Sequence, residues 1–97
     1  MINKRNKFII NILSVNGKNQ VIKMCEEMGE LITALSRWYI NDRPNLDNVH
    51  EELVDVIFMA EQMRCYFGIT QEEVNERING KIQKYKDRHK EFQNDDK

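Results

Sequence analysis

The sequence has little of what a sheet protein, a disulfide scaffold or a membrane protein needs. It contains one proline and four glycines, and it lacks alternating β-branched segments, which indicates an all-α fold. Its two cysteines, Cys25 and Cys65, have no CxxC partner and favour a reduced, cytoplasmic protein. No apolar run approaches the roughly 20 residues that span a bilayer. Asn11 interrupts the N-terminal apolar stretch and no cleavage site follows, so we expect no membrane segment and no secretory signal.

A large excess of charge of one sign is also missing. The chain has 15 Lys and Arg against 16 Asp and Glu, with a formal net charge of −1. The sequence therefore predicts no stable nucleic-acid binding. A length of 97 residues predicts a single domain, with a core at about 18–90 and a polar tail at 91–97. A chain this short buries only roughly 60–65% of its unfolded surface, so we expect self-association to supply the missing burial.

Periodic apolar positions predict four helices, at about 3–15, 18–40, 47–67 and 70–90. In the two long helices these positions step by four and three, which is typical of a buried helix face. The expected buried positions are Val21, Cys25, Met28, Ile32, Leu35 and Tyr39 on the second helix, Val49, Leu53, Val56, Ala60, Met63 and Phe67 on the third, and Val74, Ile78, Ile82 and Tyr85 on the fourth.

Local sequence predicts the helix ends as well. Asn16-Gly17 would end the first helix in a left-handed conformation, and Gly68 would end the third. Asn48 or Asp47 is the expected N-cap of the third helix. The run Thr70-Gln71-Glu72-Glu73 predicts a capping box at the start of the fourth.

Two carboxylate pairs lie within the long helices. Glu27 and Glu30 belong to the run CEEMGEL, and Glu52 and Asp55 belong to HEELVDV. Residues three apart share a helix face, and Glu52 falls inside the apolar sector of its helix, where a carboxylate is costly unless it is neutralised. Antiparallel packing of the two helices would gather four carboxylates around a hard divalent cation, Mg²⁺ above all. The alternative is that these are solvated acidic faces of a non-enzymatic helical dimer, a regulatory or interaction module.

The two motifs resemble the ExxE and ExxD signature of the MazG-like, all-α nucleoside triphosphate pyrophosphohydrolases. The resemblance covers about residues 18–90 and extends to the contexts EEMGELITALSR and EELVDVIFMAEQ. It implies a four-helix MazG-like bundle in which two long antiparallel helices carry the motifs, and assembly into a homodimer or homotetramer completes the fold. It also implies Mg²⁺-dependent cleavage of a (deoxy)nucleoside triphosphate between its α- and β-phosphates, giving the monophosphate and pyrophosphate, with Mn²⁺ as an alternative metal. Carried over residue by residue, the metal ligands are Glu27, Glu30, Glu52 and Asp55.

Glu30 is the candidate general base, because a carboxylate beside the metal can accept a proton from the attacking water. Lys23 lies on the same side of its helix and is placed either to reach phosphate or to form an ion pair with the acids. Trp38 flanks the apolar face on the carboxylate side and is a candidate for stacking on the base.

The last helix offers cations for the phosphate chain. Arg77, Lys81, Lys84 and Arg88 step by four, three and four and so share a face. The resemblance matches Asn79-Gly80-Lys81 to an Asn-x-Lys element that contacts phosphates, which makes Lys81 the first candidate and Lys84 and Arg88 the next. A mid-helix glycine costs roughly 1 kcal/mol against alanine, so Gly80 favours a close approach at that point.

Two related interpretations fit the residues less well. A phosphoribosyl-ATP pyrophosphohydrolase would carry a Tyr-His pair where this chain has Phe58-Met59. A di-iron carboxylate protein needs two Glu-x-x-His motifs, and only Asp47-x-x-His50 approaches one.

Overall fold

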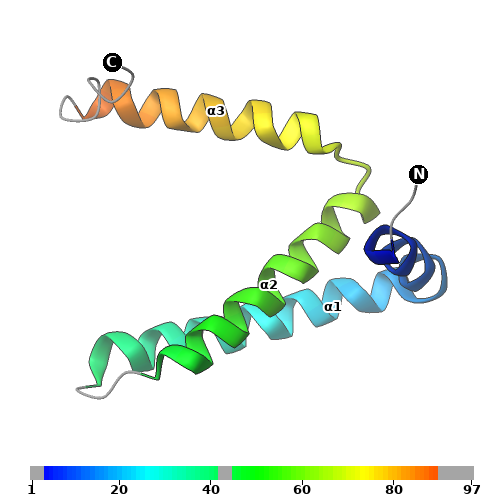
Figure 1. The fold of residues 1–97 in the computed structure, drawn as a ribbon, viewed down its shortest axis with the longest axis horizontal. Coiled ribbons are helices and arrows are strands. Elements are labelled where there is room, and N and C mark those ends of the chain that lie inside the picture. Colours follow the sequence, from blue (N-terminus) through cyan, green and yellow to red (C-terminus); the bar gives the residue numbers. More distant parts are fainter. Residues whose placement is uncertain (1–3, 42–44, 90–97) are drawn as a thin grey trace.

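Three helices make up the computed structural model, which describes residues 4–41 and 45–89 (Figure 1). They are α1 (Lys4–Ile40), α2 (Leu46–Tyr66) and α3 (Gln71–Arg88), and no strand occurs in these ranges. The all-α fold class is thereby confirmed. The four-helix arrangement is not confirmed, because the first two expected helices form the single bent helix α1. The expected tail at 91–97 lies outside the described residues.

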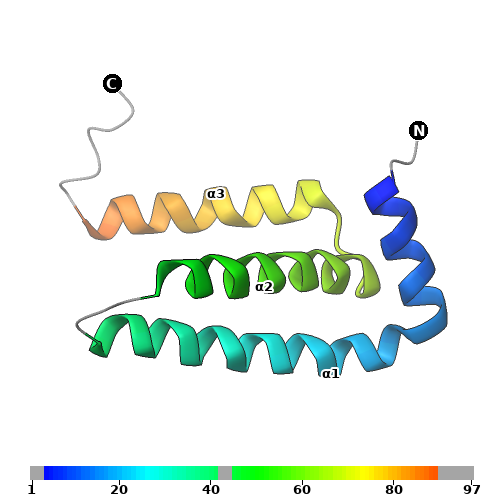
Figure 2. The ribbon, with the colours of Figure 1, turned by 60° about the horizontal axis from the view of Figure 1, so that its bottom comes forward.

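α1 bends sharply at Asn16, where φ is −146° and ψ is 26° (Figure 2). We call residues 4–15, before this bend, the N-terminal arm. The break is where the sequence predicts it, but the predicted left-handed conformation is wrong, because Gly68 alone among the described residues has a positive φ. Gly17 serves another purpose: a Cβ there would lie 2.5 Å from Cε1 of Tyr66. The glycine therefore lets the Tyr66 ring approach the helix backbone at the bend.

Beyond the bend, α1 runs antiparallel to α2, and the N-terminal arm crosses the C-terminal end of α2 (Figure 2). Phe8 of the arm stacks on Phe58 of α2, with ring centroids 6.2 Å apart. Arg5 and Glu61 form an ion pair between the same two elements. The small apolar core lies among these three segments and contains Ile9, Ala34 and Met59.

The helix faces that pack are not the apolar faces that the sequence predicts. On α1 the buried positions beyond the bend include Glu27 and Ala34, roughly 100° around the helix from the expected face. On α2 the buried positions are Met59 and Gln62. Most of the expected positions are exposed: Cys25, Met28, Ile32, Leu35 and Tyr39 on α1, Leu53 and Ala60 on α2, and Phe67 at the C-cap of α2. The prediction that these positions are buried is therefore wrong for a single chain.

The ends of α2 and α3 follow local chemistry. Asn45, rather than Asp47 or Asn48, is the N-cap of α2, and its Oδ1 accepts a hydrogen bond from the Asn48 amide at 3.0 Å. The left-handed Gly68, at φ 71°, is confirmed. So is the cap at Thr70, whose Oγ1 accepts from the Glu73 amide at 3.1 Å.

α3 leaves α2 through a short turn and packs against neither of the other helices within the described ranges (Figure 1). It contains no buried residue. Its apolar row is therefore open, with Ile78 and Ile82 each 48% exposed. Across the part of the chain that the structure describes, every helix is too short or too polar to cross a membrane.

Candidate metal centre

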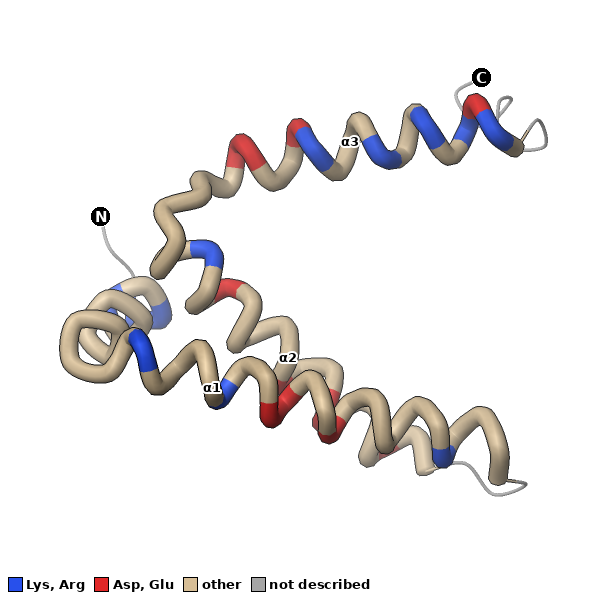
Figure 3. The backbone as a smooth tube through the Cα atoms, turned by 180° about the vertical axis from the view of Figure 1, so that it is seen from behind, with Lys and Arg blue, Asp and Glu red and all other residues tan. Residues whose placement is uncertain are grey.

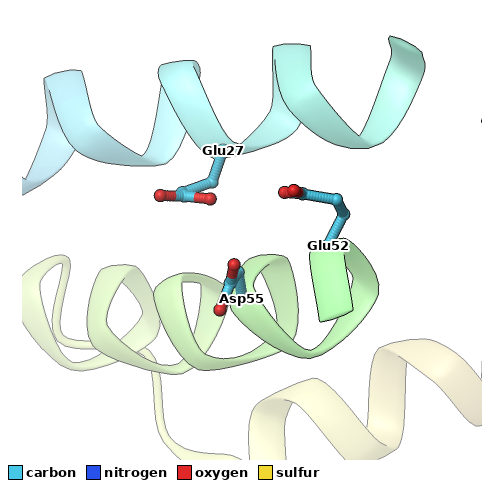
Figure 4. A group of neighbouring side chains, drawn as sticks. All are labelled: Glu27, Glu52 and Asp55. Atoms are coloured by element: carbon cyan, nitrogen blue, oxygen red, sulfur yellow. The ribbon is translucent and has the colours of Figure 1, made fainter. Parts of the chain in front are cut away.

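Three of the four predicted carboxylates lie together between α1 and α2. Glu27 extends from α1, while Glu52 and Asp55 extend from successive turns of α2 (Figure 4). One oxygen of each lies within 4.8 Å of the other two. The antiparallel pairing of the helices explains the arrangement, because Glu27 faces the i, i+3 pair on α2. We call these three residues the carboxylate cluster.

The cluster is partly removed from water and lacks internal neutralisation. Glu27 is only 8% exposed, and one oxygen each of Glu27 and Glu52, Oε2 in both, is buried without a hydrogen-bond partner among the described residues. Lys23 supplies one positive charge, with Nζ 3.2 Å from Glu27 Oε1. Buried carboxylates are costly unless they are paired or coordinate a metal. Unpartnered, hard oxygen donors of this kind fit Mg²⁺ or Mn²⁺.

The pKa values of two residues at the site also reflect its burial and its negative charge. Burial raises the pKa of Glu52 above its usual value near 4.5, and the negative charge and hydrogen bonding of Glu30 raise this pKa further, followed by Asp55 and Glu27. The hydrogen bond to Glu27, together with the charges of Glu27 and Glu26, raises the pKa of Lys23. Burial disfavours the charged form of Glu52, and the neighbouring carboxylates favour a proton on Glu52 and the positive charge on Lys23.

Glu30, the fourth predicted ligand and the candidate base, lies beside the cluster. It is exposed and near enough to Glu52 to affect the pKa of that residue, but it is not one of the three whose oxygens converge.

The predicted phosphate-binding residues are not brought to the cluster within one chain. Asn79, Lys81, Lys84 and Arg88 all lie on α3, which contacts neither α1 nor α2, and the basic residues of α3 are separated from the acidic residues of the helix pair (Figure 3). Lys81 and Lys84 line a shallow hollow of about 290 Å³ on α3 itself. A Cβ on Gly80 would meet nothing within 4 Å, so the close approach expected there is not found within this chain.

Trp38 also lies away from the cluster. It is 43% exposed and roughly 16 Å along α1 from Glu27 at 1.5 Å per residue. The single chain therefore does not place it near a ligand of the cluster.

The structure adds a feature that the motifs do not reveal: a hollow of about 320 Å³ that shares Glu27 and Asp55 with the cluster. Its other lining residues are Phe8, Ile12, Gln20, Lys23, Phe58, Met59 and Gln62. Part of this was available in the sequence, because Gln20, Lys23 and Glu27 step by three and four along one helix face. The sequence does not predict that the N-terminal arm lines this hollow, because that depends on the direction of the bend at Asn16.

No protein-family model, curated protein or solved structure matches the chain. The function of the carboxylate cluster is therefore inferred from its geometry and chemistry.

Proposed function

We propose that the chain is a Mg²⁺-dependent nucleotide pyrophosphohydrolase of the MazG-like type, with Mn²⁺ as an alternative metal. It would cleave a nucleoside triphosphate between the α- and β-phosphates to give the monophosphate and pyrophosphate. The observation that carries this proposal is the convergence of Glu27, Glu52 and Asp55 within 4.8 Å, with a buried and unpartnered oxygen on Glu27 and on Glu52. Such a donor set suits a hard cation that also binds phosphate oxygens.

The residues around the cluster have complementary roles in this proposal. Glu27, Glu52 and Asp55 would hold the divalent ion, which when bound polarises phosphoryl oxygens and lowers the pKa of an attacking water. Glu30, exposed beside Glu52, would accept the proton of that water. Lys23, now paired with Glu27, would be free to contact a phosphate once the ion neutralises the carboxylate.

The proposal includes a second copy of the chain, because a single copy is too open to be a finished fold. Its radius of gyration is 17.1 Å, against about 12.5 Å for a compact chain of 97 residues. Its accessible surface is 8312 Å², whereas a compact monomer of this mass exposes about 5,800 Å². The excess is of the order that a stable protein interface buries.

The exposed apolar positions of α1 and α2 and the apolar row of α3 supply the surfaces for such an assembly. Lys81, Lys84 and Arg88 lie on the flank of that row, at roughly 60–120° around α3 from Ile78. When the row packs on another copy, this basic flank would lie along the edge of the contact. We propose that α3 of one copy supplies phosphate-binding cations to the carboxylate cluster of another, in a homodimer or a homotetramer built from dimers.

The test of this function is a panel of ribonucleoside and deoxyribonucleoside triphosphates incubated with Mg²⁺ and assayed for both monophosphate and pyrophosphate. We expect stoichiometric release of the two products from at least one nucleotide. Glu52→Gln and Asp55→Asn should each lower kcat/KM by more than about 100-fold, because losing a metal ligand costs at least as much as losing a group that supports one. Calorimetry with Mn²⁺ should show binding to the wild type and weaker binding to both variants.

Glu51→Gln is the matched control, because Glu51 is the exposed neighbour of Glu52 on α2 and should tolerate the change. Release of orthophosphate alone would contradict the α–β cleavage. A chain that binds neither Mg²⁺ nor Mn²⁺ would contradict the metal site and support the non-enzymatic helical module.

A further inference from the structure

The hollow beside the carboxylate cluster is continuous with it. Glu27 and Asp55 belong to both, and the hollow extends from them toward Phe8 and Ile12 of the N-terminal arm. A nucleotide whose phosphates lie at the cluster must direct its sugar and base away from it. The volume of about 320 Å³ is within the range of small-molecule sites.

One wall of the hollow carries an ordered pair of carboxamides. Gln62 is 1% exposed, and its Oε1 accepts a hydrogen bond from Gln20 Nε2 at 2.7 Å. Gln62 Nε2 donates to Met59 Sδ at 3.5 Å, which fixes the direction of the buried amide. The bond to Gln62 uses one hydrogen of Gln20 Nε2. The second hydrogen and Oε1 of Gln20 therefore offer a donor and an acceptor side by side.

Two aromatic side chains also line the hollow. Phe8 and Phe58 have ring planes 25° apart and remain 54% and 36% exposed. Partly exposed rings that line a pocket provide a face on which a planar base can stack. Lys23 lines the same hollow and is paired with Glu27, so it supplies positive charge beside the carboxylate cluster.

We propose that this hollow binds the nucleobase of the substrate, with Gln20 hydrogen-bonding the base edge and Phe8 and Phe58 contacting the ring. Gln62 is a positioning residue that holds the Gln20 amide in one orientation. The proposal rests on the function proposed above and names its specificity determinant. Cytosine and adenine present an amino donor beside a ring-nitrogen acceptor, whereas uracil and guanine present a carbonyl acceptor beside a ring N–H donor, so the two classes have opposite donor and acceptor orders. A fixed Gln20 amide therefore discriminates between them.

The first experiment compares kcat/KM for cytidine against uridine triphosphate and for adenosine against guanosine triphosphate, using the full-length chain. We expect one class to be favoured at least about tenfold in the wild type, because a site built for one hydrogen-bond order leaves polar groups unpaired with the other. Gln20→Leu should reduce this ratio to within about twofold of unity. Gln62→Leu should reduce the kcat/KM ratio mainly through KM. Gln62 does not contact substrate in this proposal, but its loss frees the Gln20 amide to change orientation.

Gln83→Leu, at an exposed position on α3, is the control and should leave the ratio unchanged. A folded Gln20→Leu variant with the wild-type ratio would overturn the proposal. Should Gln62→Leu fail to fold, Gln20→Leu still decides the test, because Gln20 is only half-buried and its replacement should leave the fold intact.

The second experiment separates this inference from the catalytic one. Cytidine, uridine, adenosine and guanosine, which lack phosphate, are titrated without metal and followed by NMR chemical-shift changes. Binding of at least one nucleoside to the wild type, weakened about tenfold in Phe8→Ala, supports the pocket even where no nucleotide releases pyrophosphate. Failure of all four nucleosides to perturb the protein overturns the pocket, whereas absence of pyrophosphate release overturns only the proposed reaction.

Discussion

The surroundings of Glu52 disfavour the charged form of its carboxyl group. Glu52 faces α1 from the packed side of α2, one of its oxygens is buried without a partner, and burial together with Glu30, Asp55 and Glu27 raises its pKa. A raised carboxyl pKa means that the folded chain binds more protons than the unfolded chain between the two pKa values. Stability of the metal-free protein therefore falls as pH rises through the folded pKa of Glu52.

This gives a prediction for metal-free protein. Glu52→Gln should raise the midpoint of thermal unfolding at high pH, where the wild-type carboxylate is ionised, and the difference should shrink as the pH falls and Glu52 takes up a proton. Thermal unfolding followed by circular dichroism across this range measures the effect. Glu51→Gln should show no such pH-dependent difference. Equal midpoints for wild type and Glu52→Gln at every pH would show that the cluster is not under electrostatic strain.

At the scale of helices, the bend in α1 decides the shape of the site. It turns the N-terminal arm across α2, and this brings Phe8 beside Phe58 and completes the hollow. Next to the bend, the ring of Tyr66 packs against Gly17 and leaves no space for a Cβ. We expect this contact to restrain the arm relative to the carboxylate cluster.

Gly17→Ala should consequently destabilise the fold by about 1 kcal/mol, because overpacking costs about 1–3 kcal/mol and the gain in helix propensity returns about 1 kcal/mol. In a Tyr66→Ala background the same change should be neutral or stabilising. Urea denaturation of the four chains gives this coupling as a double-mutant cycle. Additive effects of the two substitutions would show that the ring contact does not restrain the bend.

Much at this scale could be predicted from sequence, because it depends on neighbouring residues. The helix content, the break near Asn16, the left-handed Gly68 and the cap at Thr70 are all local effects. The i, i+3 spacing also places Glu52 and Asp55 on one face of α2, although their convergence with Glu27 depends on which helix faces pack. The N-cap at Asn45 was missed by two to three residues because several adjacent residues can cap.

What could not be predicted is which face of each long helix packs on the other. The residues that meet between α1 and α2 include Glu27, Glu52 and Gln62, while Ile32 and Leu53 remain exposed. Apolar periodicity identifies a surface that needs covering, but it does not say whether the same chain or another copy covers it. The direction of the arm and the position of α3 depend on such long-range packing, and so does the hollow.

At the scale of the whole molecule, the open row on α3 predicts association. Ile82→Glu should reduce the assembly to single chains, because a charge in an apolar contact is costly to desolvate. Light scattering on the purified chain measures the mass of the assembly at about 10 µM, a concentration above the Kd of a stable complex. Gln83→Glu introduces the same residue at the next position, roughly 100° around the helix, and should leave the mass unchanged. A wild-type chain that is already single at this concentration would contradict the proposed assembly.

The turn between α2 and α3 is short, and several local interactions define its conformation. Gly68 is left-handed at φ 71°, Arg64 Nη1 donates to the Ile69 carbonyl at 2.9 Å, and the cap at Thr70 starts the next helix immediately. These few bonds set the angle at which α3 projects from the helix pair. The spacing and relative tilt of neighbouring copies would then depend on a short turn outside the carboxylate cluster, whose Ile69 lines a hollow with Val74 and Ile78 of the apolar row. A substitution confined to this turn would change the direction of α3, and therefore the copy that α3 contacts. The residues of the carboxylate cluster and of α3 itself would be unchanged.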